Sequence, residues 1–458
     1  MNPTPDPAIL AIADFLADPV EAADFPQHIL RWRNDRAAAE IGLDTLTDQQ
    51  WLDHFGKFAP LPDNLPDPLA LRYHGHQFGT YNPDLGDGRG FLFAQFRDRE
   101  TRLIDLGTKG SGQTPWSRFG DGRLTLKGAV RELLATEMLA AFGVDTSRTL
   151  SIVETGEALH RGDEPSPTRS AVMVRQNHGH IRIGSFQRLA HLDRSQEMER
   201  LLRYCLIHYT GLDAHEAETL DVDTAAARLV AFAAPRCART AASYMVAGFV
   251  HGVLNTDNIN ITGESFDYGP WRFTPTWDPA FTAAYFDHGG LYAFGRQPQA
   301  IHWNVGQLAV SLRTIAAAEP LVEALESFAP AYEAALAERF CWRLGVEQGS
   351  AEQDKALVIA AERLMRASEV LIDDFYADWA GGRTPEGADS PERSALIDAL
   401  SGRSATRSDW TAITTPQSLH IEEVEALWAP IAEADNWQPV LTKIAAIRAM
   451  GTALATAS

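Results

Sequence analysis

Strand-like and helical patterns occupy different halves of this chain. Short apolar runs bounded by turn residues, the pattern of β-strands, are concentrated before about residue 190. After Asp193 the apolar residues instead recur at helical spacing, in long stretches rich in Ala and Leu. The 458 residues also exceed the ~250–300 at which a single hydrophobic core stops growing. We therefore expect an α+β protein with a mixed α/β N-terminal lobe and a mainly α-helical C-terminal lobe.

Local patterns predict the individual elements. The segment Asp14–Phe58 mixes short apolar clusters with acids and prolines, and four prolines between residues 60 and 68 follow it, so we expect an extended lead-in. After it we expect strands at Phe91–Phe96, Leu103–Leu106, Arg148–Val153 and Ala171–Val174. A helix is expected at Leu124–Phe142, where Gly143 ends it, and further helices at Gln196–His208 and Thr224–Val250. After Gln307 we expect mainly helix, including one helix that Ser390 caps and Pro391 begins.

Charge and cysteine content exclude several classes of function. The chain has 40 basic and 61 acidic side chains, a net charge of −21, which repels nucleic acid and anionic membrane surfaces. Three cysteines without a C-x-x-C spacing suggest neither a disulfide framework nor a thiolate zinc site. The first basic residue is Arg31, and no apolar run approaches the ~20 residues of a membrane span. We expect a cytoplasmic protein.

A lysine beside glycines follows one predicted strand. In Thr108-Lys109-Gly110-Ser111-Gly112 the sheet would hold the lysine, and the glycines would let the backbone approach a phosphate. Glu132, 23 positions further on, lies on the predicted helix and could pair with Lys109, as a strand lysine and a helix glutamate do in kinases. The alternatives are a solvated turn and an ordinary helical glutamate.

A second cluster combines oxygen ligands with a free carboxylate. The run His251–Asn258 is followed, nine residues after Asn258, by Asp267-Tyr268-Gly269-Pro270. Asn258 and Asp267 could hold a magnesium ion if Ile259–Ile261 forms a short strand and a hairpin-like turn follows it, which would leave Asp257 free as a base. Two Asx turns are the structural alternative.

Other charged and histidine-containing segments are less specific. Arg175 ends a predicted strand and Arg182 follows at a spacing of seven, so the two could grip a polyphosphate or could form surface ion pairs. The tetrapeptide Gly-Asp-Gly-Arg occurs at residues 86–89 and again at 120–123, each copy in a predicted loop. The histidine pairs at 74/76 and 178/180 have no third ligand at a fitting spacing, which argues against zinc.

Several longer motifs occur in fixed order and together resemble one family. They are Tyr73–Gly79 (YHGHQFG), Leu85–Arg89 (LGDGR), Lys109–Arg118 (KGSGQTPWSR), and Asn255–Asn258 (NTDN) with Asp267–Pro270 (DYGP). In these motifs the chain resembles the selenoprotein O family, known in bacteria as SelO or YdiU. The resemblance covers about residues 69–309, and the C-terminal third matches only loosely.

The resemblance implies a protein-kinase-like bilobal fold in which the nucleotide is flipped, so that the α-phosphate of ATP faces the acceptor. Such proteins transfer AMP from ATP to Ser, Thr or Tyr hydroxyls of protein substrates, with magnesium or manganese as the metal. The implied division is a lead-in over residues 1–68, a nucleotide-binding lobe over 69–190, and a helical lobe over 191–458 that carries the catalytic and metal-binding loop.

The family's functional residues can be placed on matching positions. The resemblance implies Asp257 as the catalytic base and Asn258 and Asp267 as metal ligands, with Asp267 also at the nucleotide. The other implied nucleotide-binding residues are Lys109, Arg175 and Arg182 at the phosphates, Glu132 orienting Lys109, and Gly86, Gly88, Arg89, Asp121 and Gly122 along the nucleotide.

Two features depart from the family pattern. Relatives usually have Ala-Gly-His where this chain has His74-Gly75-His76, and they often end in a selenocysteine or cysteine, whereas no cysteine follows Cys341 here. Two alternatives to AMP transfer stay open, a protein kinase that transfers the γ-phosphate and an ATP-binding pseudokinase that acts as a scaffold.

Overall fold

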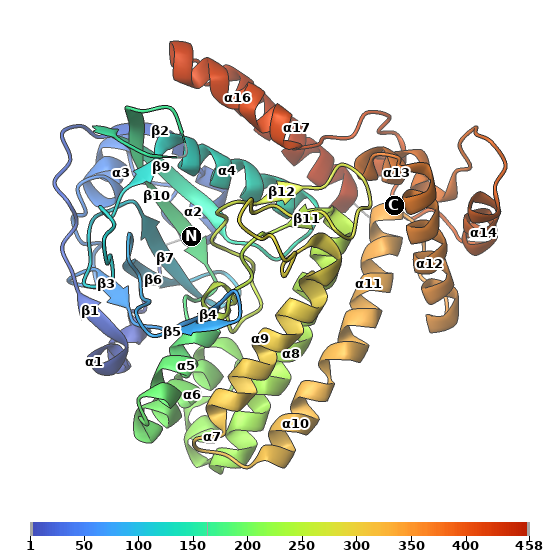
Figure 1. Ribbon diagram of the computed structural model, residues 1–458. Coiled ribbons are helices and arrows are strands. Elements are labelled where there is room, and N and C mark those ends of the chain that lie inside the picture. The colour runs from blue at the N-terminus through green and yellow to red at the C-terminus, as the bar shows by residue number, and fades with distance from the viewer. Residues whose placement is uncertain (1–2, 163, 456–458) are drawn as a thin grey trace.

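An antiparallel sheet of eight strands forms one part of the molecule in the computed structural model, which describes residues 3–162 and 164–455 (Figure 1). In spatial order the strands are β1 (Ala17–Pro19), β3 (Leu69–Leu71), β6 (Leu92–Arg97), β7 (Leu103–Lys109), β10 (Thr168–Asn177), β9 (Arg148–Leu159) and β2 (Ile29–Arg33), and β8 (Leu124–Thr125) pairs with β10. The four strands predicted from local pattern are confirmed, and each extends beyond its predicted end. Helices cover both faces of the sheet, which explains why β6 and β7 are buried along nearly their whole length.

The expected extended lead-in is wrong. Residues 14–58 contain the sheet strands β1 and β2 and the helices α1 (Ala13–Leu16), α2 (Asp35–Glu40) and α3 (Asp48–Phe55). Trp51 and Phe55 of α3 are fully buried in a core that includes Phe93 of β6 and Leu106 of β7. This segment therefore closes one face of the sheet and supplies two of its outer strands.

Helix α4 (Leu126–Ala141) covers the other face, and its prediction is confirmed. The side-chain oxygen of Thr125 accepts a hydrogen bond from the amide of Gly128 at 3.0 Å and caps the first turn. Gly143 has a φ of +65°, the left-handed conformation that favours glycine after a helix. Between these ends, Leu133, Leu134 and Met138 are fully buried, and α4 packs against β9 and β10.

The second part of the molecule is built from helices, as predicted. Its elements are α5 (Ile183–His191), α6 (Ser195–Tyr209), α7 (Ala214–Thr219), α8 (Val222–Ala247), α9 (Gln297–Leu312), α10 (Ala318–Glu326), α11 (Phe328–Leu344), α12 (Ala351–Ser368), α13 (Ile372–Asp378), α14 (Pro391–Leu400) and α15 (Ser408–Thr411). The long helix α8 is central and packs against α6, α9, α10 and α11 (Figure 1). Ser390 caps α14 as expected, since its hydroxyl accepts from the amide of Arg393.

Several other elements are short. They are the strand pairs β4 (Gly75–Gln77) with β5 (Thr80–Asn82) and β11 (Phe249–Val250) with β12 (Arg272–Phe273), and the 3-10 helices η1 (Ala8–Ala11), η2 (Thr256–Asn258), η3 (Phe294–Arg296) and η4 (Ala380–Gly382). Within the described ranges, none of the helices combines the length and apolar character that crossing a membrane requires. The three cysteines are buried and unpaired.

Two helices late in the sequence return to the sheet part. Helices α16 (Ile421–Ala434) and α17 (Gln438–Ala455) lie beside α4 (Figure 1). The backbones approach closely, because a Cβ on Gly451 would lie 2.8 Å from Cα of Ala141. Arg448 forms two hydrogen bonds of 2.7 Å with the carboxylate of Glu137 on α4. Helix α17 therefore packs along α4, and Arg448 also contacts Trp32 of strand β2 and Asn34 beside it.

Replacing Arg448 with Met should lower the free energy of unfolding by about 1–3 kcal/mol, because Glu137 is mostly buried and would lose its paired charge. Thermal or urea unfolding of the purified variant measures this effect. Arg200→Met is the matched control, since its ion pair with Asp14 is exposed and such pairs contribute about 0–1 kcal/mol. An equal decrease in the free energy of unfolding in the two variants would show that the contact between α17 and α4 stabilises the protein no more than an exposed ion pair does.

Candidate active site

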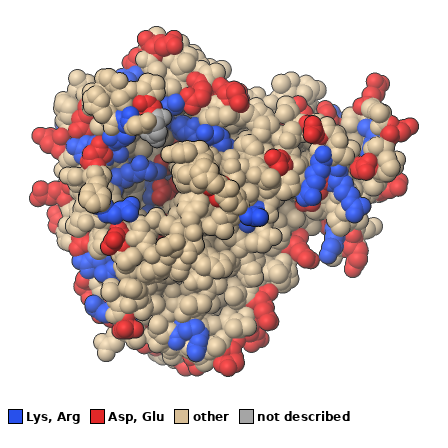
Figure 2. Space-filling model, in the orientation of Figure 1, with Lys and Arg blue, Asp and Glu red and all other residues tan. Residues whose placement is uncertain are grey.

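A cleft of about 620 Å³ lies where the sheet part meets the helical part. It is lined by the loop before β6, the end of β7, a loop over residues 116–123, and residues of β10 and of the loops around η2 and before β12. Basic side chains gather around this hollow on one face of an acidic protein (Figure 2). The cleft has the size of sites that bind small molecules, and its charge suits an anion.

Most of the predicted site residues lie in this one cleft. Those that line it are Gly86, Gly88, Arg89, Lys109, Asp121, Gly122, Arg175, Arg182, Asp257 and Asp267. Glu132 lies behind Lys109 on α4, and Asn258 lines a separate, very small cavity. The structure thus brings together residues that are up to 181 positions apart, from Gly86 to Asp267.

Lys109 is the last residue of β7 and contacts two carboxylates. Its Nζ is hydrogen-bonded to Glu132 of α4 and, at 2.8 Å, to Oδ1 of Asp267. The side chains of Lys109 and Glu132 are each only 5% exposed. The predicted pairing of Lys109 with Glu132 is therefore present in the structure, and it fixes the lysine head group at the wall of the cleft.

Asp267 is surrounded by cations. Besides Lys109, Nη1 of Arg175 lies 3.2 Å from Oδ1 of Asp267, and Nη1 of Arg182 lies 3.7 Å from Oδ2. Burial alone would raise the pKa of Asp267, but these three positive charges outweigh it and hold the pKa well below its usual value. The residue also has a φ of +64°, a left-handed conformation that aspartate adopts more readily than most non-glycine residues.

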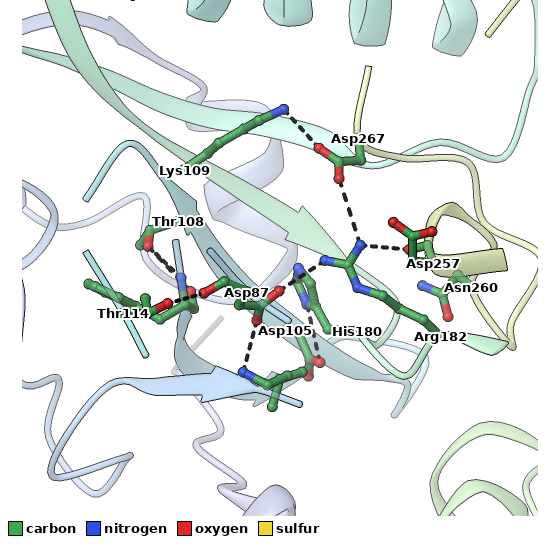
Figure 3. A network of polar contacts seen from close by, with 12 residues as sticks. Asp87, Asp105, Thr108, Lys109, Thr114, His180, Arg182, Asp257, Asn260 and Asp267 are labelled. Carbon is green, nitrogen blue, oxygen red and sulfur yellow. Dashed lines mark hydrogen bonds and ion pairs between the residues drawn. The ribbon is translucent and has the colours of Figure 1, made fainter. Parts of the chain in front are cut away.

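Arg182 connects several walls of the cleft (Figure 3). Its guanidinium donates to the backbone oxygen of Asp257 at 2.8 Å and to Oδ1 of Asp87 at 3.1 Å. The same group lies over the rings of Tyr73 and Phe266, at 4.4 and 4.8 Å from their centres. These contacts leave the guanidinium little freedom, so that its charge is held in one place before any ligand binds.

Asp257 lies in η2, close to Gly75 of β4. A Cβ on Gly75 would come within 2.8 Å of Oδ1 of Asp257, so only a glycine allows this approach. Oδ1 is buried and has no hydrogen-bond partner among the described residues. Burial is the main reason that the pKa of Asp257 is raised to about 6, although the nearby Arg182 lowers it. A carboxylate with these properties is suited to accept a proton near neutral pH.

Asn258 is less clearly part of this site. Its side-chain amide donates to the backbone oxygen of Val253 at 2.9 Å, and within the described residues it makes no hydrogen bond with Asp267. The strand expected at Ile259–Ile261 is wrong, since only an isolated bridge between Asn260 and Arg182 occurs there. The joint metal-binding role of Asn258 and Asp267 stays a prediction.

Both copies of the repeated tetrapeptide line the cleft. In the first copy, a Cβ on Gly86 would lie 2.4 Å from the ring of Trp116. In the second, Gly122 has a φ of +71°, and a Cβ there would lie 2.2 Å from the backbone of Gly112. A side chain at either position would therefore collide with its neighbours, so both Gly86 and Gly122 are required for this packing.

Several cleft residues were not predicted. Asp87 binds both Arg182 and, through Oδ2, the amide of Leu71. Tyr73, His180 and Trp116 also line the cleft. Asp87 and Tyr73 lie inside motifs that the sequence singled out, and their charge and aromaticity could have marked them as partners for an arginine.

Known proteins resemble this chain over nearly its whole length. The family model described as protein adenylyltransferase SelO matches residues 2–417. A protein nucleotidyltransferase YdiU of Synechocystis sp. is 42% identical over 470 residues, which cover 96% of each chain. Proteins of the same name from Trichormus variabilis and Synechococcus elongatus are 41% and 43% identical, over 97% and 95% of this chain and 96% and 93% of theirs. The likeness therefore extends well beyond residues 69–309, where the motifs occur.

Proposed function

Because the chain belongs to the SelO family of protein adenylyltransferases, we propose that it transfers AMP from ATP to Ser, Thr or Tyr hydroxyls of other proteins with a divalent cation. The observation that carries the proposal is the meeting of Lys109, Arg175 and Arg182 with Asp257 and Asp267 in one cleft. Cations suited to a polyphosphate thus lie in the same cleft as a carboxylate suited to take up a proton.

The proposed architecture is protein-kinase-like. The lobe over residues 69–190 would contribute Lys109 and the glycine-containing loops, and the lobe over residues 191–458 would contribute Asp257 and Asp267. The pairing of a strand lysine with a helix glutamate supports this assignment, as does the position of the cleft between sheet and helices.

Each cleft residue has a defined part in the proposed reaction. Lys109, Arg175 and Arg182 would bind phosphate oxygens, and the loops with Gly86, Gly88, Arg89, Asp121 and Gly122 would hold the rest of the nucleotide. The flipped orientation inferred from the family would point the α-phosphate toward the acceptor. Positioning and charge neutralisation are what this class of reaction mainly requires.

The residues present fit a hard divalent cation. Asp267 offers carboxylate oxygens inside the cleft, and Asn258, which lines a separate small cavity and whose amide nitrogen is bonded to Val253, would add an amide oxygen. Together with phosphate oxygens, such donors suit Mg²⁺ or Mn²⁺. When bound, the cation would neutralise phosphate charge.

The bond changes follow from this arrangement. The acceptor hydroxyl oxygen attacks the α-phosphorus, and the bond between that phosphorus and the bridging oxygen of pyrophosphate breaks. The hydroxyl proton passes to Asp257, and pyrophosphate leaves with its charge held by the cations of the cleft. The protein product carries AMP in a phosphodiester bond.

The position of a radioactive label in ATP tests this function directly. The protein is incubated with magnesium and ATP labelled at either the α- or the γ-phosphate, and label is followed into the protein itself and into an added acceptor. We expect transfer of the α label alone. Transfer of the γ label alone would identify a kinase, and ATP binding without transfer of either label would identify a scaffold.

The pH dependence should report on Asp257. Because this carboxyl must be ionised to accept a proton and has a pKa of about 6, kcat/KM should rise from pH 5 to about pH 7 and then level off. Initial rates of AMP transfer at saturating magnesium measure the profile. A rate that falls as the pH rises through 6 would exclude Asp257 as the base.

A further inference from the structure

An apolar groove lies on the helical part, between α9 and α10. Its volume is about 420 Å³. Trp303 and Val310 of α9 and Val322 of α10 line it and are 45%, 61% and 54% exposed. Large apolar side chains are rarely left in contact with water as a group unless they bind something.

The groove also lacks the charge that covers most of this protein. Its lining contains no Asp or Glu, although the chain has 61 of them, and its one charged residue is Arg313. The guanidinium of Arg313 is engaged with the backbone oxygen of Ala316. In Figure 2 the central face over α9 is almost free of charged side chains, whereas charged side chains lie along the lower edge, near α10. Helix α10 carries the exposed Glu319, Glu323 and Glu326, which lie outside the groove lining. The groove lining itself suits an uncharged, apolar ligand.

Direct contacts join the groove to the catalytic loop. The ring of Trp303 meets His76 edge to face, with centres 5.1 Å apart, and the amide of His76 donates to the hydroxyl of Thr256, next to Asp257. Asn304, the neighbour of Trp303, donates to the backbone oxygen of Leu254 at 2.8 Å. The groove is therefore linked to the loop that carries Asp257 through His76 and through the side chain of Asn304.

More exposed apolar side chains lie on the loop after β12. Tyr285 is 84% exposed and Phe286 43% exposed, and Phe286 packs on Phe78 near the same catalytic loop. The amide of Phe78 donates to Asn255 at 3.1 Å. Exposed apolar side chains of the groove and of this loop thus both contact residues that are hydrogen-bonded to the loop around η2.

We propose that the groove binds an apolar side chain of the acceptor polypeptide, close in sequence to the hydroxyl residue that receives AMP. This inference rests on the proposed function and adds a determinant of acceptor choice, a flanking Leu, Ile, Val, Met or Phe. A second copy of this chain is a poorer occupant, because each copy has a net charge of −21 and repels the other.

A single introduced thiol can block the groove. The native cysteines are buried, so Val310→Cys would supply the reactive thiol, which is coupled to a bulky anionic maleimide. The unlabelled variant controls for the substitution. Ile359→Cys, coupled in the same way, is the matched control, since Ile359 is 41% exposed on the distant helix α12. The acceptors are synthetic peptides with the same Ser, Thr and Tyr, flanked by leucines or by aspartates at varied positions.

We expect the unlabelled protein to prefer leucine-flanked peptides. Blocking position 310 should lower kcat/KM for these peptides by about tenfold to a hundredfold, the effect of losing one buried apolar side chain. ATP binding and the reaction with aspartate-flanked peptides should stay unchanged, and labelling at 359 should change neither reaction.

Different outcomes separate failure of this inference from failure of the proposed function. Transfer of the α label with no leucine preference, or a preference that survives blocking at 310, would overturn the inference alone. A native dimer that labelling at 310 dissociates would assign the groove to a second copy and overturn it as well. Transfer of only the γ label would refute AMP transfer, while the leucine preference could still be measured.

Discussion

Replacing Asp257 with Asn should reduce AMP transfer by about 10²–10⁴-fold, the contribution usual for a general base. The amide has nearly the same shape as the carboxylate, but it cannot accept the hydroxyl proton. ATP affinity should change little, since Arg182 binds the backbone oxygen of Asp257 and keeps this contact in the variant. Rates of AMP transfer and equilibrium binding of ATP measure the two effects separately.

Asp84→Asn is a suitable control for this substitution. Asp84 is exposed and lies two residues before Gly86, but it is not part of the cleft lining. Its variant should transfer AMP at the rate of the unmodified protein. Wild-type rates in Asp257→Asn, with ATP binding intact, would show that another group or the solvent takes the proton.

Replacing Asp267 with Asn should lower transfer by about 10³-fold at saturating magnesium, which corresponds to several kcal/mol of transition-state stabilisation by a bound metal. The substitution removes the carboxylate that Lys109, Arg175 and Arg182 share and leaves their positive charges less balanced. Metal-free ATP should therefore bind at least as tightly as before, while the gain in affinity from magnesium should be lost.

Stability gives a second measurement for the Asp267 variant. Because the pKa of Asp267 is held below its unfolded value, its ionised form stabilises the folded protein above about pH 4, and this contribution is lost as the pH falls further. Asp267→Asn should therefore unfold at a lower temperature than the unmodified protein at pH 7, with a smaller difference in acid. An unchanged magnesium dependence of transfer would contradict the assigned metal ligand.

Local sequence patterns predicted most central elements but not the outer strands. The helix Leu126–Ala141 has a cap, a helical apolar repeat and a terminating glycine, so its sequence alone specifies it. Strands β1 and β2 are short, and their partners β3 and β9 lie far along the chain. Their formation depends on tertiary pairing, which no local pattern encodes.

The candidate-site residues could be predicted where a charged side chain lies within a recognisable sequence motif. Lys109, Arg175, Arg182, Asp257 and Asp267 carry charges beside glycines or strand ends, and all five line the cleft. The clamp on Arg182 by Tyr73, Phe266 and Asp87 was missed, because it arises only when three separate segments meet. The groove between α9 and α10 was missed for the same reason.

The contact between α17 and α4 also has a consequence for biosynthesis. Helix α4 carries Glu132, the partner of Lys109, but the ribosome makes α17 only after most of the chain. A nascent chain that has completed the sheet and the cleft residues still lacks the ion pair of Arg448 with Glu137. The helix that positions Lys109 therefore gains its last stabilising contact only late in translation, after both walls of the cleft have been synthesised.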